Sequence, residues 1–590
     1  MTDTPRYLIT TADERTWKFD RPVLFLGEWC RLYDRRHIWS KMDAIVAAPY
    51  GLGQAQKDKD HALARTIEAQ LLPVLRDQLN KIHGANHSLR YWQIVLGHWL
   101  RRYVDVVFNR YHTLQQCLEN YPIRGTAVLS SDTYHLATQD SLSFIWASND
   151  DTWNSVLSAR VLKYLPCEKV TTEYVSIEDG HGFRMQEGKY SDSLGRRLKQ
   201  FVRRQVETMT NWFVREDDAF IVNSYLPLMY EWKLQVSLGQ IPNLRRSPKP
   251  KPFDADSEPR KRLAQRVSRG AVNGFSDCAA VLLFELLPTC YLEGFSALCA
   301  QTGQLPWPAR PSFIFTSNDF DTDEIFKCWS ARKAVEKIPY YTGQHGNNYG
   351  THRYANPSVE EVTADKFLTW GWTDGLPQHT PAFIFEIAGR KSQSHNPSGG
   401  LLLSEVHLNH RIATWDGYQE FKTYCEEQQS FVNKLNPACR DALTIRLHSA
   451  YRSLGWSEET RWHDFCSELR IDTGSQPIHA LVAESRLVVH SYDSTGMLET
   501  LSQNIPTLAF WQNDLDHLRD SARPYYQLLV DAGIVYLTAE SAAAKVNEVW
   551  DNVEGWWAKN AVQNARKQFC DRYVRVSQNP LCDLKKLLQE

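Results

Sequence analysis

The chain has 590 residues, of which 43% are hydrophobic and 23% charged, and its formal net charge is −2 at pH 7. This composition is that of a globular protein with more than one hydrophobic core. The balanced charge argues against nucleic-acid binding, no apolar stretch approaches the roughly 20 residues that span a bilayer, and the first residues do not resemble a signal peptide. The twelve cysteines lack paired metal-binding spacing, so we expect reduced thiols and a cytoplasmic protein.

The N-terminal half begins with a short apolar run and then becomes mainly helical. VLFLG, within residues 21–30, predicts a buried strand. Apolar residues at three- and four-residue spacing predict long helices over about 59–120, and further helices are expected within 193–215 and 260–302. We therefore expect a large, mainly helical insertion over about 55–300.

Residues 241–262 are rich in proline and charge, which predicts an exposed, mobile loop. The basic residues of this loop are Arg245, Arg246, Lys249, Lys251, Arg260, Lys261 and Arg262. Two interpretations stay open: a solvated loop, or peripheral contact with an anionic membrane surface.

After residue 310, short apolar runs alternate with helical patterns. The runs are PSFIFTS, KIPYYTG and ADKFLTWGW, and later GLLLSEVH, LTIRLHS, SRLVVHS, PTLAFW and GIVYLT. Such alternation predicts parallel sheets with helices on both faces. The predicted fold is α/β, with two doubly wound, Rossmann-like domains facing a cleft. We place the N-terminal domain at 1–385 and the C-terminal domain at 386–590.

The apolar run SRLVVH (485–490) stops at the small polar turn SYDSTG, directly before a helical pattern. Ligands of an open parallel sheet bind beyond the carboxyl ends of its strands, and the start of a helix offers backbone N–H groups to an anion. We therefore expect this turn to bind the phosphate of an activated donor, with a carboxylate one helical turn on to accept ribose hydroxyls. The residues of this expected site are Ser491, Ser494, Thr495, Gly496 and Glu499. The alternative is that Ser494 or Thr495 only caps the helix.

Two potential cations stand at the end of another apolar run, LTIRLHS (443–449). Arg446 and His448 are two residues apart and so lie on the same side of a strand. We expect them to face the leaving phosphate of the donor. The alternative is that Arg446 pairs with a neighbouring carboxylate.

A glycine- and asparagine-rich loop, TGQHGNNYGTHRY (342–354), follows a third apolar run. Its His345 has an ordinary pKa near neutrality and could accept a proton from an attacking hydroxyl. We expect His345 to be the general base. The neighbours expected to complete the loop site are Gln344, Gly346 and Asn347, and His352 and Arg353 could neutralise a phosphate.

Carboxylates provide further candidates for the base. Glu28 follows VLFLG, and Asp319 follows FIFTS; each could instead cap a helix. A third candidate is the acidic pair Glu178–Asp179 before Gly180, which is similar to the acidic-glycine motif of several bacterial sialyltransferases. The chain has no P-loop, no G-x-G-x-x-G after a strand, no G-x-S-x-G and no H-E-x-x-H, which argues against ATP hydrolysis, nicotinamide chemistry, serine hydrolysis and zinc proteolysis.

Four blocks together resemble one family of transferases. The blocks are FLGEWCRLY, HSLRYWQIVLGHWL, GQHGNNYGTHRY with ADKFLTWGW, and VVHSYDSTGMLETLSQNIPTLAFW. The family is encoded among bacterial surface-polysaccharide genes, for O-antigen lipopolysaccharide and capsule, and is named after a Leptospira member. The resemblance covers most of the chain apart from roughly 125–260.

More distantly, the second half is similar to GT-B Kdo and nonulosonate transferases and to CDP-glycerol glycerophosphotransferases. The resemblance implies a GT-B glycosyltransferase that uses a nucleotide-sugar donor, with CMP as one candidate nucleotide, and a lipid-linked or oligosaccharide acceptor. In those relatives the hydroxyl pair matching Ser494 and Thr495 binds phosphate, and the histidine-glycine pair matching His345 and Gly346 carries the base. His448 is followed by Ser449 and not by proline, which departs from the sialyltransferase pattern. We expect no metal and no other cofactor.

Two rival functions stay open. One is a CDP-glycerol-type polyol-phosphate transferase, which breaks a different bond of its donor. The other is a non-catalytic glycan-binding or assembly protein on the same scaffold.

Overall fold

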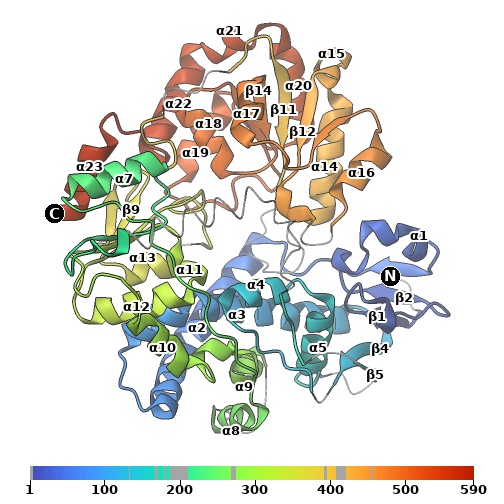
Figure 1. The fold of residues 1–590 in the computed structure, drawn as a ribbon. Coiled ribbons are helices and arrows are strands. Elements are labelled where there is room, and N and C mark those ends of the chain that lie inside the picture. Colours follow the sequence, from blue (N-terminus) through green and yellow to red (C-terminus); the bar gives the residue numbers. More distant parts are fainter. Residues whose placement is uncertain are drawn as a thin grey trace, which may run out of the picture.

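The computed structural model describes residues 4–590 except 132, 167–169, 178–180, 186–209, 268–273, 356, 391–394, 407–419 and 453–455. The described chain folds into three all-parallel β-sheets covered by helices (Figure 1). The predicted parallel α/β class is confirmed, and the structure adds a sheet to the two expected, because residues 1–385 contain two separate sheets. The division at residue 385 stays a prediction.

The first sheet has the strand order β3-β2-β1-β4-β5 and lies at the lower right of Figure 1. Its strands are β1 (Arg6–Ile9), β2 (Val23–Phe25), β3 (Ala44–Val46), β4 (Ile123–Ser130) and β5 (Thr171–Ser176). Between β3 and β4 the chain forms the two long predicted helices, α2 (Gln54–His83) and α3 (Leu89–Asn120). Gly84 ends α2 at φ 60°, a left-handed conformation that favours glycine, and Ser88 caps α3 by accepting from the Tyr91 N–H.

Further helices lie in the described part of residues 1–310. They are α1 (Arg36–Trp39), α4 (Ser141–Ala147), α5 (Asp151–Leu162), α7 (Leu228–Ser237), α8 (Ser257–Val267), α9 (Phe275–Leu286) and α10 (Phe295–Gly303). The helices expected within 260–302 are therefore present. Of the helix expected within 193–215, the part before residue 210 lies outside the described residues, as does the acidic motif at 178–180.

Two of the basic residues of 241–262 are buried. Arg245 is only 7% exposed and lies over the Phe220 ring, 4.6 Å from its centroid. Arg260 is 4% exposed, pairs with Glu293 at 2.7 Å and donates to the Phe284 and Leu287 carbonyls. These two arginines therefore do not take part in the membrane contact that one of the two interpretations allowed, because their guanidinium groups are buried. The other five basic residues are exposed.

The second sheet has the order β10-β9-β8-β7-β6. Its strands are β6 (Phe220–Ile221), β7 (Ile314–Thr316), β8 (Tyr340–Gly343), β9 (Lys366–Thr369) and β10 (His379–Pro381), and its short connecting helices are α11 (Asp319–Thr322), α12 (Glu324–Val335) and α13 (Val359–Thr363). The last helix of the chain, α23 (Pro580–Gln589), also packs here: Leu584 and Leu588 join the apolar cluster around Phe315 and Leu368.

The third sheet has the order β13-β12-β11-β14-β15-β16 and forms the upper half of Figure 1. Its strands are β11 (Gly400–Ser404), β12 (Leu443–Arg446), β13 (Arg470–Asp472), β14 (Ser485–His490), β15 (Thr507–Phe510) and β16 (Val535–Tyr536). β12 and β13 lie on one side of β11, and β14, β15 and β16 lie on the other side. The direction of winding therefore reverses between β11 and β14. That reversal is where open α/β sheets bind ligands.

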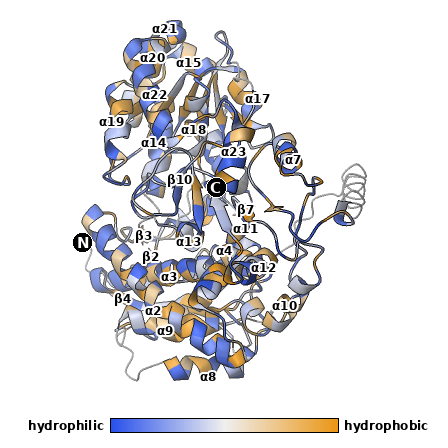
Figure 2. Ribbon diagram, turned by 90° about the vertical axis from the view of Figure 1, so that its left-hand side faces the viewer, coloured by the Kyte–Doolittle hydropathy of each residue, from blue (hydrophilic) through white to orange (hydrophobic). Residues whose placement is uncertain are grey.

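Helices cover both faces of the third sheet, which explains why its central strands are nearly continuous apolar runs. They are α14 (Phe421–Lys434), α15 (Pro437–Asp441), α16 (Glu458–Phe465), α17 (Ile478–Ala483), α18 (Thr495–Ser502), α19 (Arg523–Asp531), α20 (Ala539–Val549), α21 (Val553–Trp557) and α22 (Asn560–Tyr573). Figure 2 shows hydrophilic and hydrophobic residues alternating along α20 and α22, as expected of helices between core and water. Over the residues that the structure describes, we find no helix with the length and apolar character needed to cross a bilayer.

Buried histidines predict acid lability of this fold. Burial lowers the pKa of His490 to about 3 and that of His98 to about 4. Between pH 6.5 and about 4 the unfolded chain binds these protons and the folded chain does not, so stability is complete above pH 6.5 and falls as the pH decreases. Each such histidine costs about 1.4 kcal/mol of unfolding free energy per pH unit. Urea unfolding at intervals from pH 7.5 to 4.5 should show this decline; an unchanged midpoint would contradict it.

Candidate functional site

The turn beyond β14 begins a helix whose N-terminus is capped by Ser494. The Ser494 Oγ accepts from the Met497 N–H at 2.9 Å. Ser491 is fully buried, 2.9 Å from the Tyr424 hydroxyl, and donates to the Ser404 carbonyl at 3.1 Å. Both serines therefore hold the turn in shape, whereas Thr495 and Gly496 are partly exposed at the first turn of α18. The backbone groups at this end are those that could receive an anion.

A pocket of about 300 Å³ opens at the carboxyl ends of β11, β12 and β14, where the winding of the third sheet reverses. Arg446, His448, Gly496 and Glu499, four of the residues expected to bind the donor, line it. Residues in its wall that the sequence did not single out include Arg390, Ser404, Glu405, His479, His490 and Tyr492. The pocket thus brings together residues as distant in the chain as Arg390 and Glu499.

The basic residues of this pocket differ in charge state and in their partners. Arg446 forms an ion pair with Asp472, as the alternative interpretation expected, and still lines the pocket. Burial and the nearby Arg446 charge lower the pKa of His448, so its ring is neutral at pH 7. Arg390 is exposed and lines the pocket beside Glu499, where its charge opposes the rise that burial causes in the pKa of that carboxyl. Arg390 is the cation best placed to meet an entering phosphate.

The loop beyond β8 is held against the turn that follows β14. Gln344 is 1% exposed; its Oε1 accepts from the Trp370 N–H at 2.9 Å, and its Nε2 donates to the Gly346 carbonyl at 2.9 Å. The next peptide reaches the third sheet, because the Asn347 N–H donates to Thr495 Oγ1 at 2.9 Å. A Cβ at Gly346 would lie 3.2 Å from the same hydroxyl, so the close approach favours glycine. Two expected parts of the site therefore meet directly.

His345 lies at this junction in a partly buried position. Its Nδ1 is 3.2 Å from the Tyr349 hydroxyl, which donates in turn to Glu360. The rings of Tyr225 and Phe320 flank the imidazole at 5.6 and 5.8 Å between centroids. Burial lowers the pKa of His345, and the Glu360 carboxylate opposes that effect. The imidazole is thus neutral at pH 7 and able to accept a proton.

Asp319 lies at the same edge of the second sheet. It begins α11, accepts from Asn223 Nδ2 at 2.9 Å, and has its pKa raised to about 7 by burial, with Asp323 adding to the rise. Tyr225, which contacts the His345 ring, lies close enough to Asp319 for the two groups to interact electrostatically. Asp319 and His345 therefore belong to one region of the molecule.

Glu28 lies elsewhere. It follows β2 in the first sheet, pairs with Arg31 at 2.6 Å, and does not line the pocket at the third sheet. Arg353 pairs with Asp58 at 2.9 Å, and His352 lies 3.2 Å from Asp493, so both are directed away from the pocket as well. The structure thus gathers His345, Asp319 and the turn after β14 and leaves Glu28 and Arg353 outside that group, whereas His352 contacts Asp493 of the turn but does not line the pocket.

Several residues of the region were not found from sequence. Tyr349 lies four positions after His345 inside the quoted loop, a spacing that could have suggested a contact; Glu360 and Arg390 lie in segments without a recognisable motif. Glu386 also faces this region: burial raises its pKa to about 8, and the nearby Glu499 adds to the rise. Among the described residues, one group could hold a metal ion, namely His352, Asp493 and His517.

Several solved structures are similar to this chain at low sequence identity. The wall teichoic acid polymerase TagF is 10% identical over 69% of this chain and 98% of its own, with a TM-score of 0.33. The spinosyn rhamnosyltransferase SpnG, complexed with spinosyn aglycone, is 14% identical over 63% of this chain and 99% of its own, with a TM-score of 0.32. MnaA of S. aureus with UDP is 12% identical over 49% of this chain and 83% of its own, with a TM-score of 0.29.

None of the curated proteins matches this chain. The model of the LIC12162 family transferase, in contrast, matches residues 6–588. This match confirms the resemblance that the four sequence blocks indicated, and it extends over the region 125–260 that they left out. The chain belongs to the LIC12162 family of transferases.

Proposed function

We propose that this transferase is a glycosyltransferase that takes its sugar from a nucleotide donor bound in the pocket at the third sheet. The observation that supports this most strongly is the hydrogen bond between the Asn347 N–H and Thr495 Oγ1. It joins the loop of a neutral histidine to the start of α18, beside a pocket of about 300 Å³. A proton acceptor and an anion-binding helix end are the two groups that glycosyl transfer from a phosphate donor requires.

In the proposed reaction, a hydroxyl of the acceptor attacks the anomeric carbon of the donor while His345 takes the hydroxyl proton. The bond between the anomeric carbon and the phosphate oxygen breaks, and the electron pair leaves with the nucleotide. The helix N-terminus and Arg390 stabilise the negative charge that develops on this phosphate. Both are fixed features of the protein, and together they supply this stabilisation without a metal at the leaving group.

The acceptor would approach along the edge of the second sheet, where Asp319 and Tyr225 adjoin His345. We propose a lipid-linked or growing surface glycan as acceptor, Kdo- or nonulosonate-type sugars as the first donors to test, and CMP as the first nucleotide. The reaction would take place in the cytoplasm. The exposed residues Lys249 and Lys251 would allow contact with the inner membrane if the acceptor is anchored there.

Thermal denaturation with CMP, CDP, UDP, GDP and ADP tests the donor site directly. One nucleotide should raise Tm, since a ligand at a hundredfold excess over its Kd adds about 2.7 kcal/mol to the free energy of unfolding. An Arg390→Ala variant should lose most of that shift. Equal responses of variant and wild type, or no response to any nucleotide, would argue for a non-catalytic glycan-binding protein.

The product identifies which bond of the donor breaks. CMP-sugars and CDP-glycerol are supplied separately. With a CMP-sugar the mass of the glycan product should increase by a sugar without phosphorus, and with CDP-glycerol it should not change. A product that gains glycerol phosphate would show the rival polyol-phosphate transfer at the same site. The distinction depends on the product, because both donors release CMP.

Tyr349 and Glu360 are proposed as positioning residues for the base. Tyr349→Phe should lower kcat about 3- to 10-fold, the equivalent of one hydrogen bond of roughly 1 kcal/mol, and leave KM for the donor unchanged. Tyr573→Phe removes a hydroxyl that donates to the Ser521 carbonyl and serves as the matched control. If the Tyr349 variant changes KM and leaves kcat as it was, the hydroxyl does not position the base.

A further inference from the structure

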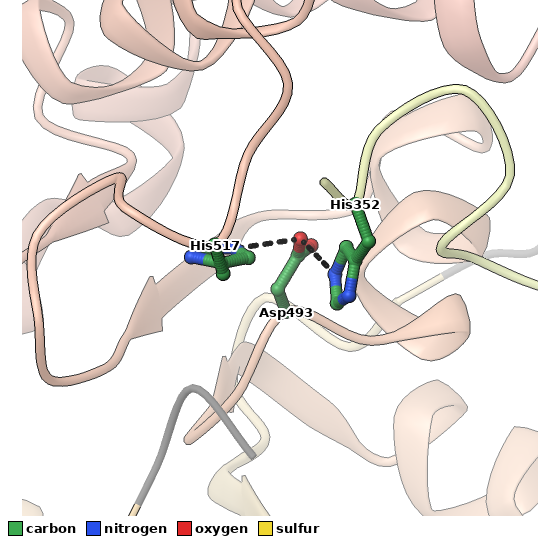
Figure 3. A group of neighbouring side chains, drawn as sticks. All are labelled: His352, Asp493 and His517. Atoms are coloured by element: carbon green, nitrogen blue, oxygen red, sulfur yellow. Dashed lines mark hydrogen bonds and ion pairs between the residues drawn. The ribbon is translucent and has the colours of Figure 1, made fainter. Parts of the chain in front are cut away.

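Three side chains from separate loops converge on one another behind the phosphate-binding turn (Figure 3). His352 comes from the loop that carries His345, Asp493 precedes Ser494 in the turn, and His517 follows β15. The Nε2 atoms of both histidines lie 3.2 Å from the same oxygen, Asp493 Oδ2. The three potential ligand atoms all lie within 4.8 Å of one another.

The cluster is buried and its carboxylate is oriented from outside. The side chain of Asp493 is 0% exposed, that of His517 3% and that of His352 13%. Asp493 Oδ1 accepts from Asn347 Nδ2 at 2.7 Å and from the Tyr526 hydroxyl at 3.0 Å, and this hydroxyl is also 2.9 Å from Oδ2. Such partners fix the direction in which a carboxylate presents its other oxygen, as outer-shell groups of metal sites do.

The spacing within the cluster fits a metal site as well as a hydrogen-bonded ion pair. A charge-assisted N–H···O⁻ hydrogen bond is about 2.7–2.9 Å long. In a tetrahedral zinc site with bonds of about 2.0–2.1 Å, neighbouring ligand atoms are about 3.3 Å apart. Both nitrogen–oxygen distances in this cluster are 3.2 Å. This value is closer to the distance between neighbouring ligand atoms in a zinc tetrahedron than to the length of a short, charge-assisted hydrogen bond.

We propose that His352 Nε2, His517 Nε2 and Asp493 Oδ2 bind one Zn²⁺ ion. Imidazole nitrogen with carboxylate oxygen is a donor set that zinc accepts. A separate cavity of about 140 Å³ adjoins the cluster, because one of the three ligands, His517, lines it together with Asn513, Asp516 and Lys57.

The role of the ion is structural. None of its three ligands lines the donor pocket, so the ion does not contact the leaving group there. It cross-links the loop of the second sheet to the turn of the third, next to backbone hydrogen bonds from the Arg353 N–H to the His517 carbonyl and from the Arg519 N–H to the Thr351 carbonyl, both 2.8 Å long. The zinc proposal does not depend on which group the enzyme transfers.

Metal binding is measured on the full-length protein without donor or acceptor. After treatment with a chelator and its removal, the protein should take up one equivalent of Zn²⁺ at pH 7.5, and Co²⁺ in its place should give the visible absorption of a tetrahedral site. Asp493→Asn preserves the shape of the side chain and removes its charge; His352→Gln changes the least buried ligand. Each variant should weaken metal affinity by about tenfold or more. Each should also lose the rise in Tm that Zn²⁺ gives the wild type.

Two control variants identify other sources of binding. His463→Ala removes an exposed imidazole on α16, and Cys299→Ser removes one thiol of the pair Cys299–Cys328, whose sulfurs are 3.7 Å apart. Both should keep one equivalent of zinc. The proposal is overturned if the wild type takes up no stoichiometric ion, or if folded Asp493→Asn and His352→Gln bind zinc as the wild type does; the cluster would then be a hydrogen-bonded junction only. These outcomes are independent of those of the nucleotide and product assays.

Discussion

Replacing His345 by glutamine is expected to lower kcat by a factor of about 10²–10⁴, the usual contribution of a general base. The imidazole is neutral at pH 7, its Nδ1 faces the Tyr349 hydroxyl, and its loop is hydrogen-bonded to the start of α18. Glutamine keeps a polar side chain of similar length but cannot accept a proton at this pH. Steady-state kinetics with the donor identified by thermal denaturation would measure the effect.

The pH profile provides a second measurement of the same residue. Because burial lowers the pKa of His345 below its ordinary value of 6.5, kcat/KM should rise with pH on a limb below 6.5 and be level at pH 7 and above. The limb should disappear in the His345→Gln variant, whereas the exposed control His463→Gln should retain it. Full kcat in His345→Gln would remove this residue from the reaction and leave Asp319 as the candidate base.

Replacing Thr495 by valine is expected to raise the Kd of the donor about 10- to 150-fold. The side chains have nearly the same shape, and the change removes a hydroxyl at the N-terminus of α18, where hydrogen bonds to a charged group contribute about 1.5–3 kcal/mol. The substitution also removes the acceptor of the Asn347 N–H and so loosens the contact between the two sheets. Calorimetric titration with the nucleotide would report the change in affinity.

Variants of two serines in the same region distinguish an effect on donor affinity from an effect on the stability of α18. Ser502→Ala removes a hydroxyl near the other end of α18, which donates to the Glu499 carbonyl, and should leave the Kd unchanged. Ser494→Ala removes the cap and should cost about 1 kcal/mol of unfolding free energy. If Thr495→Val bound the nucleotide as tightly as the wild type, the phosphate would not contact the Thr495 hydroxyl.

The sequence was sufficient to predict the parallel α/β class but not the number of sheets. Apolar runs such as SRLVVH indicate buried strands, and their alternation with helices indicates parallel pairing of those strands. The strand Phe220–Ile221 is only two residues long, and β4 returns to β1 after two helices of 30 and 32 residues. Which strands share a sheet depends on such long-range pairings, and local periodicity does not encode them.

The candidate site, like the fold, could be predicted only where local sequence determines it. His345 and Thr495 stand in recognisable loops, because glycine, asparagine and small hydroxyl residues mark tight turns. Their contact is a property of the packed sheets and could not be read from spacing. The same holds for the cluster of His352, Asp493 and His517, which come from three loops. Arg390 follows a segment without any motif, so only the coordinates connect it to the pocket.

The position of α23 constrains how the second and third sheets can move. After α22, the chain returns to the second sheet: the Arg575 N–H donates to the Trp370 carbonyl at 2.8 Å, and the Ile384 N–H donates to the Arg575 carbonyl at 2.9 Å. The chain therefore passes between these two units twice, once between β10 and β11 and once after α22. Two covalent tethers permit swinging about the line that joins them and resist sliding or separation of the two sheets.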